Sequence, residues 1–140
     1  MLYHKPGWAL PNGHIVRSHV EASLCADLVA AEVPHLHGAP EVLSFQVAIA
    51  PRRHSLFVPR IVLTEARSAG RQIIIEPIDS VQPGGGVRRL AGFRQAHLAE
   101  YFVIVVSRRV LHHQVPEAAY DQIFPLEDFR PLEKFLLSLG

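Results

Sequence analysis

The sequence predicts an α/β (α+β) fold in which a single mixed β-sheet is flanked by helices. Residues 55–107 read as two buried strands, a glycine break, an arginine-rich helix and a third buried strand. The 140 residues are 49% hydrophobic, which is enough for one sizeable core, and no shift in composition marks a second domain. We therefore expect residues 1–140 to form a single domain.

The first element is expected to be a helix at residues 19–33. Ser18 followed three residues later by Glu21 is the pattern of a capping box, and apolar residues then recur at helical spacing. A proline ends this pattern, and residues 35–40 are expected to be a connection.

Three strands are expected next, at residues 42–50, 56–63 and 72–78. The aliphatic run in the last of them indicates that both of its faces are covered. Residues 64–71 are expected to form a hairpin-like loop, so that neighbouring strands pair antiparallel.

The second half of the chain is expected to contain a helix, a buried strand and two C-terminal helices, at residues 87–98, 101–106, 116–123 and 131–139. The core of the predicted fold then covers about residues 18–107, in the order α-β-β-β-α-β. Residues 115–140 form a predicted C-terminal helical extension.

This order resembles the core of the PD-(D/E)XK nuclease-like superfamily, whose fold is restriction-endonuclease-like. The resemblance implies a Mg²⁺ site built from an aspartate after a proline on the second strand, a carboxylate and a lysine on the third, and often a glutamate on the first helix. Pro59, Glu76 and Glu21 stand at positions similar to the proline and two of the carboxylates. Arg60 replaces the aspartate, however, and Ile78 replaces the lysine.

A cation at the metal position weakens the binding of a divalent ion. We therefore expect no metal and no cofactor at this site, and Mg²⁺ only if nuclease activity is retained through migrated catalytic residues. The candidate catalytic residues are then Glu76, Glu21 and Asp79. The alternative is a relic site in which Arg60 and Glu76 form an ion pair across neighbouring strands, because neither charge is stable when buried alone.

Arg94 lies within the apolar stripe of the helix at residues 87–98, so its side chain is expected to point inward. An inward arginine needs a carboxylate, and Glu76 or Asp79 is the nearest candidate. Arg94 then forms either a structural pair or a phosphate clamp.

The glycines Gly84, Gly85 and Gly86, followed by Arg88 and Arg89, form a candidate anion cradle. Glycines let backbone N–H groups face a ligand at a helix N-terminus, and the arginines add charge. The segment matches neither of the common nucleotide-binding motifs. A plain connecting loop, a site for nucleic-acid phosphates and a small-anion site are all consistent with it.

The charge of the chain is unevenly distributed, although the net charge is only +1. Residues 51–109 hold ten arginines against four acidic residues, whereas residues 116–140 hold five acidic residues against two basic ones. This asymmetry favours DNA or RNA as a partner, with a solvated arginine-rich surface as the alternative. We expect a catalytically inactive protein associated with nucleic acid.

The alternative function is a partner-binding or homodimeric module that uses the apolar stripe of the last helix. The same stripe is also explained if that helix packs on its own sheet.

Nine histidines raise the question of a metal site. The best candidates are His35, His37, His54, His112 and His113. A structural zinc site normally needs four ligands and the chain has one cysteine, so we expect these histidines to hold no metal. Cys25 lies within an apolar helix pattern and is expected to be a small buried side chain.

The start of the chain lacks the basic and apolar segments of a signal peptide, and no run approaches the roughly 20 apolar residues of a membrane span. We therefore expect a cytoplasmic protein with no membrane partner.

Overall fold

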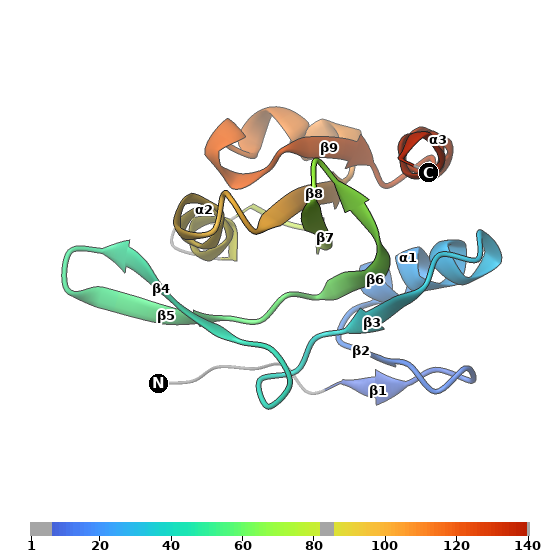
Figure 1. The fold of residues 1–140 in the computed structure, drawn as a ribbon, viewed down its shortest axis with the longest axis horizontal. Helices are drawn as coiled ribbons and strands as arrows, with labels where there is room; N and C mark the ends of the chain where they lie inside the picture. Colours follow the sequence, from blue (N-terminus) through green and yellow to red (C-terminus); the bar gives the residue numbers. More distant parts are fainter. Residues whose placement is uncertain (1–6, 82–85, 140) are drawn as a thin grey trace.

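A five-stranded mixed sheet in the order β3-β6-β7-β8-β9 forms the centre of the protein (Figure 1). Its strands are β3 (His35–His37), β6 (Ile61–Ser68), β7 (Arg71–Ile78), β8 (Tyr101–Ser107) and β9 (Gln122–Pro125). The first three pair antiparallel, and β8 and β9 then run parallel to β7. The computed structural model describes residues 7–81 and 86–139. The prediction of a single α+β domain with a mixed sheet is confirmed.

Helices cover both faces of this sheet. One face packs against α1 (His19–Ala30) and α3 (Arg130–Ser138). The other packs against α2 (Gly86–Ala96) and a hairpin formed by β4 (Phe45–Ala50) and β5 (Arg53–Phe57), as Figure 1 shows. A second hairpin, β1 (Trp8–Ala9) and β2 (Ile15–Val16), precedes α1. No helix of the described segments is long and apolar enough to cross a membrane.

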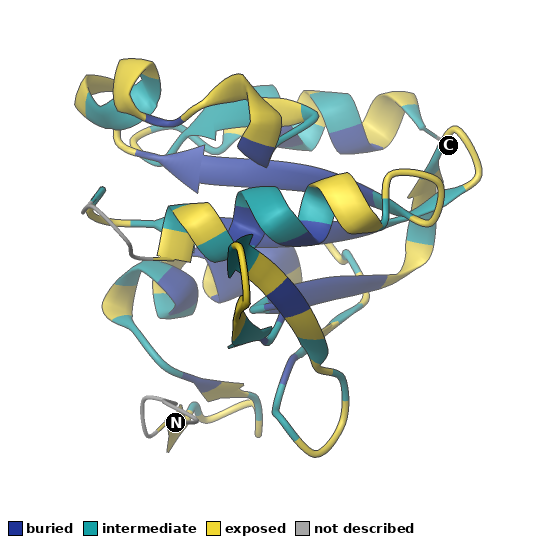
Figure 2. Cartoon of the chain, turned by 90° about the vertical axis from the view of Figure 1, so that its left-hand side faces the viewer, coloured by how far each residue is buried: buried dark blue, intermediate teal, exposed yellow. Residues whose placement is uncertain are grey.

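The aliphatic run of β7 is buried on both faces, as its sequence predicts. Ile73 and Ile75 belong to the core under α1 and α3, whereas Ile74 belongs to the core under α2. Figure 2 shows these central strands as the buried interior beneath helices whose outer faces are exposed. The two cores therefore use alternate residues of the same strands.

The expected capping signal does begin α1. The Ser18 hydroxyl accepts a hydrogen bond of 3.0 Å from the Glu21 amide. The helix ends at Ala30, three residues earlier than predicted, because Glu32 adopts a left-handed conformation with φ of 58°. The Val33 amide then donates to the Leu28 carbonyl at 2.9 Å, and the chain turns back into β3.

The predicted strands before β7 are partly wrong. The first strand of the sheet is β3, in the segment expected to be a connection, whereas residues 42–50 contribute β4 to a separate two-stranded hairpin. Residues 56–63 are split between β5 and β6. Pro59 has no amide hydrogen and the Arg60 amide bonds the Glu76 side chain, so no ladder continues across this point.

The predicted loop at residues 64–71 is mostly strand, since β6 extends to Ser68 and pairs with Arg71. The turn consists of Ala69 and Gly70 alone, both with positive φ (52° and 76°). This conformation suits a two-residue hairpin turn and is easily adopted by glycine.

The C-terminal extension is helical only in its second half. The predicted helix at residues 116–123 is a short 3-10 turn (Glu117–Ala119) followed by β9. Asp121 favours the strand over the expected helix, because its carboxylate accepts a hydrogen bond from the Val103 amide at 2.8 Å. Its own amide donates to the Val103 carbonyl at 2.8 Å. The chain is thereby fixed beside β8 as a further strand.

The last helix, α3, matches its prediction closely. Its apolar residues Leu132 and Leu136 enter the core, and Phe135 stacks on Phe102 with ring centroids 5.7 Å apart. The apolar stripe therefore packs on the protein's own sheet.

Candidate metal centre and a second polar pocket

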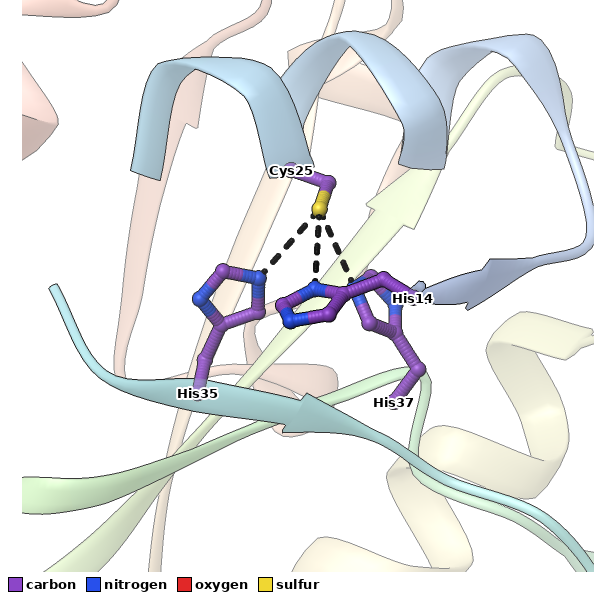
Figure 3. A group of neighbouring side chains, drawn as sticks. All are labelled: His14, Cys25, His35 and His37. Atoms are coloured by element: carbon purple, nitrogen blue, oxygen red, sulfur yellow. Dashed lines mark hydrogen bonds between the residues drawn. The ribbon is translucent and has the colours of Figure 1, made fainter. Parts of the chain in front are cut away.

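Three histidines and the single cysteine converge on one point between α1, β3 and the β1–β2 hairpin (Figure 3). They are His14, Cys25, His35 and His37, and their potential ligand atoms all lie within 4.8 Å of one another. In Figure 3 the Cys25 thiol points from the helix toward the three imidazole rings. This cluster is the candidate metal centre.

The distances within the cluster fit a tetrahedral ion. The Cys25 sulfur lies 3.2 Å from His14 Nδ1, 3.4 Å from His35 Nε2 and 3.3 Å from His37 Nε2. With Zn–S of about 2.3 Å and Zn–N of about 2.0 to 2.1 Å, neighbouring sulfur and nitrogen ligands of tetrahedral zinc are about 3.5 Å apart. The three sulfur–nitrogen distances are therefore close to those of a tetrahedral zinc site.

Two of the histidine rings are held with Nε2 facing the centre. His37 Nδ1 lies 2.5 Å from Glu21 Oε2, and the two side chains are 4% and 1% exposed. His35 Nδ1 lies 2.9 Å from the Val33 carbonyl oxygen. A carbonyl oxygen can only accept, so His35 Nδ1 carries the hydrogen and Nε2 is free to coordinate. Donation from Nδ1 to a carboxylate or carbonyl is the usual support of a metal-ligating histidine.

The local sequence explains how the ligands reach each other. Glu21 and Cys25 are four residues apart on α1 and so lie on the same helix face, where they contact Nδ1 and Nε2 of one ring, His37. His35 and His37 are two residues apart on β3 and so project to the same side of the sheet.

His14 reaches the cluster from the turn that precedes β2. Its amide donates to the Asn12 side chain at 3.0 Å, and its carbonyl accepts from the Leu10 amide at 2.8 Å. These bonds shape the tip of the β1–β2 hairpin and direct the ring toward α1. The centre therefore joins three segments that are separate in sequence.

The uncharged forms of His14 and His35 are favoured in this environment. Burial, together with the nearby charge of His37, lowers the pKa of His14. Burial likewise lowers the pKa of His35, against the effect of its bond to Val33. For Cys25, burial and the charge of Glu21 raise the pKa of the thiol, against the effect of Asn12. Neutral imidazoles can bind a cation directly, whereas the thiol must lose its proton.

The sequence pattern alone does not predict this cluster, although two of its histidines are among the candidates. The segment with His35 and His37 is expected to be a connection, whereas it forms a half-buried strand. Nothing in the sequence pattern singles out His14, and Cys25 is expected to be only a small buried side chain. The remaining candidates lie elsewhere, with His54 and His113 exposed and His112 bonded to the Ser107 carbonyl at 3.0 Å. A helical Glu-x-x-x-Cys followed by a His-x-His strand was the available signal.

A second polar site is a pocket of about 240 Å³ between β5, the end of β7 and the first turn of α2. Of the predicted site residues it is lined by Arg60, Glu76, Asp79, Gly86 and Arg89. Gly84 and Gly85 lie outside the described residues. Arg88 is exposed beside the pocket and Glu21 belongs to the metal centre. The structure thus brings together five of the predicted site residues.

Glu76 lines this pocket and is buried, 7% exposed. Burial raises its pKa to about 8, against the effect of the Arg60 amide and charge, and the charge of Glu21 adds to the increase. Its Oε2 atom accepts the Arg60 amide at 2.7 Å. Among the described residues no ion pair joins Glu76 to an arginine side chain; Arg60 contacts Glu76 through its amide, and its charge favours the ionised form of Glu76.

Arg94 points inward as predicted, but its partner is Asp121 rather than Glu76 or Asp79. Its Nη2 atom lies 3.0 Å from Asp121 Oδ1, and Arg71 Nη1 lies 3.5 Å from the same oxygen. Burial opposes ionisation of Asp121, but the bonds from Arg94 and Val103 and the two arginine charges outweigh it and lower its pKa. Arg94 is therefore a structural residue that holds α2 against the start of β9.

Comparisons of this chain with protein-family models, with curated proteins and with solved structures each found no match. The likeness to PD-(D/E)XK nucleases accordingly stays a prediction.

Proposed function

We propose that this protein binds one zinc ion through Cys25, His14, His35 and His37, and that the ion has a structural role. The observation that carries the proposal is the convergence of the four ligand atoms within 4.8 Å. One thiolate with three imidazoles is a ligand set that suits zinc, and four protein ligands leave no open position for a substrate.

The charges support a divalent ion at this point. The Cys25 thiolate and the Glu21 carboxylate that contacts His37 carry two negative charges, which balance the charge of Zn²⁺. The ion would fasten the β1–β2 hairpin, α1 and the edge strand β3 to one another. These are short elements, since β1 and β2 have two residues each and β3 has three.

Zinc titration in competition with a chelator tests the proposal. We expect one tightly bound zinc per chain, and cobalt substitution should produce the near-ultraviolet absorption of a thiolate ligand. Cys25→Ala should abolish that absorption, whereas the control His113→Ala, at an exposed histidine outside the cluster, should leave binding unchanged. Equal zinc binding by Cys25→Ala and His113→Ala would show that surface histidines hold the zinc, and it would refute the proposal.

Glu21→Gln should weaken zinc binding by about ten- to hundredfold, the usual effect of losing an outer carboxylate. The amide still fits beside His37 but no longer supplies a negative charge. Chelator competition measures the change, and Glu65→Gln, an exposed residue on β6, is the matched control. An unchanged affinity in Glu21→Gln would show that the Glu21–His37 contact only joins α1 to β3 and does not support the metal.

Nucleic-acid association is a second proposal, supported by exposed arginines that form no ion pair among the described residues. These are Arg52, Arg53, Arg67, Arg88, Arg108 and Arg109. If they bind phosphates, log K should fall with log salt by about 0.9 per contact on duplex DNA. Arg52→Ala with Arg53→Ala should reduce that slope by about one to two, and Lys134→Ala on α3 should not. A slope near zero in the native protein would rule the proposal out.

A further inference from the structure

We propose that the pocket between β5, the end of β7 and α2 binds a phosphate group, either free or as the monoester of a small molecule. The pocket has a volume of about 240 Å³, which accommodates a phosphate group and a short substituent. The proposal is independent of the metal centre, whose ligands do not line this pocket.

The cations of the pocket support an anionic ligand. Arg60 and Arg89 both line it and are half-buried, and neither forms an ion pair among the described residues. The Nη1 atom of Arg60 is fully buried and has no hydrogen-bond partner there. A buried N–H group without a partner is costly, and a ligand oxygen would satisfy it.

Glu76 complements the arginines as a hydrogen-bond donor. Its raised pKa, about 8, means that the carboxyl is mainly protonated near neutral pH. Since Oε2 accepts the Arg60 amide, the proton is available on Oε1 for a ligand that has only acceptor atoms. A phosphate dianion offers such oxygens and also matches the two guanidinium charges.

The same arrangement disfavours a divalent cation. A hard cation such as Mg²⁺ prefers several ionised oxygen ligands, and the pocket offers a protonated Glu76 with Asp79 exposed at its rim. Arg60 and Arg89 would further repel a cation. The residues that resemble a nuclease metal site thus favour an anion.

Calorimetric titration of the zinc-loaded protein with inorganic phosphate and with glycerol 3-phosphate tests the proposal. We expect saturable binding at one site, and tighter binding of glycerol 3-phosphate would identify the monoester as the source of the phosphate group. Arg60→Met and Arg89→Met should each weaken binding by about ten- to hundredfold. The matched control is Arg88→Met, on the same helix turn but exposed and outside the pocket lining.

The pH dependence supplies a second test. Glu76 is faced by Arg60 from the β5–β6 connection, by Glu21 from α1, by Asp79 beyond β7 and by Arg89 from α2. Ionisation of Glu76 should oppose the anion, so affinity should fall by about tenfold or more between about pH 7 and pH 9. In Glu76→Gln the side chain keeps a hydrogen-bond donor but does not ionise. Phosphate binding should therefore remain, and the decrease in affinity at alkaline pH should disappear.

Three results would overturn the proposal. One is the absence of binding by both phosphate compounds to folded, zinc-loaded protein. The second is equal weakening by Arg89→Met and Arg88→Met, which would indicate a diffuse surface effect. The third is binding of duplex DNA that Arg89→Met weakens while glycerol 3-phosphate fails to compete, which would assign the pocket to a nucleic-acid backbone. If the native protein binds phosphate but does not bind zinc, only the metal proposal is refuted.

Discussion

Removal of zinc with a chelator should lower the melting temperature of the protein by about 15 °C. A ligand present at a thousand times its dissociation constant stabilises the folded state by about 4 kcal/mol, and each kcal/mol shifts the melting temperature of a domain of this size by about 4 °C. The effect should be large because the four ligands come from the β1–β2 hairpin, α1 and β3. Thermal unfolding followed by circular dichroism, with and without chelator, measures it.

Variants separate the metal from other effects of the chelator. In Cys25→Ala the melting temperature should be low and should no longer respond to zinc, whereas His113→Ala should respond as the native protein does. An equal response of the two variants, or no response of the native protein, would contradict the structural role of the ion.

Glu76→Gln should stabilise the protein in mildly alkaline solution by about 5 kcal/mol. In the folded chain burial raises the Glu76 pKa from 4.5 to about 8. Between these values the folded state holds a proton that the unfolded state has released. The contribution of the protonated Glu76 carboxyl to the stability of the native protein is therefore fully present below about pH 4.5, declines as the pH rises, and is lost above about pH 8. Glutamine does not titrate and avoids this loss.

Urea unfolding at about pH 5, pH 7 and pH 9 measures the difference between the native protein and Glu76→Gln. The difference should be small at the lowest pH and largest at the highest, and zinc contributes equally to both proteins. Glu65→Gln, at an exposed position, should show no such trend. Asp121, whose pKa is lowered, affects stability only in more acid solution, where its protonation would weaken the contact with Arg94. A pH-independent difference would show that Glu76 is ionised in the folded protein.

The fold class and the most periodic elements could be predicted from the sequence because their signals are local. The Ser18 cap begins α1, the aliphatic run of β7 is buried on both faces, and the apolar stripe of α3 enters the core. The order of the sheet elements was only partly predicted, because the first strand of the sheet is β3 and the expected strand at residues 42–50 instead contributes β4 to the separate hairpin.

The errors occurred where long-range bonds decide the local structure. Residues 35–37 form a strand because they pair with β6, and Gly38 permits the close approach of the two segments, since a Cβ there would lie 1.8 Å from the Pro59 carbonyl oxygen. Asp121 likewise turns an expected helix into β9 through bonds to Val103. Neither β6 nor Val103 is near its partner in the sequence, so local secondary-structure propensity alone favours the wrong conformation.

The two candidate sites were likewise predictable only in part from the sequence. The sequence by itself determined which residues have unusual chemistry: charges within apolar strands at Arg60 and Glu76, and a His-x-His pair with one cysteine. Only the tertiary structure decided their partners. It places Arg94 beside Asp121 and Glu21 beside His37. It also brings His14 and Cys25 to the His35–His37 pair. Helical and strand periodicity specify which face a side chain occupies, but the neighbour across that face depends on how distant segments pack.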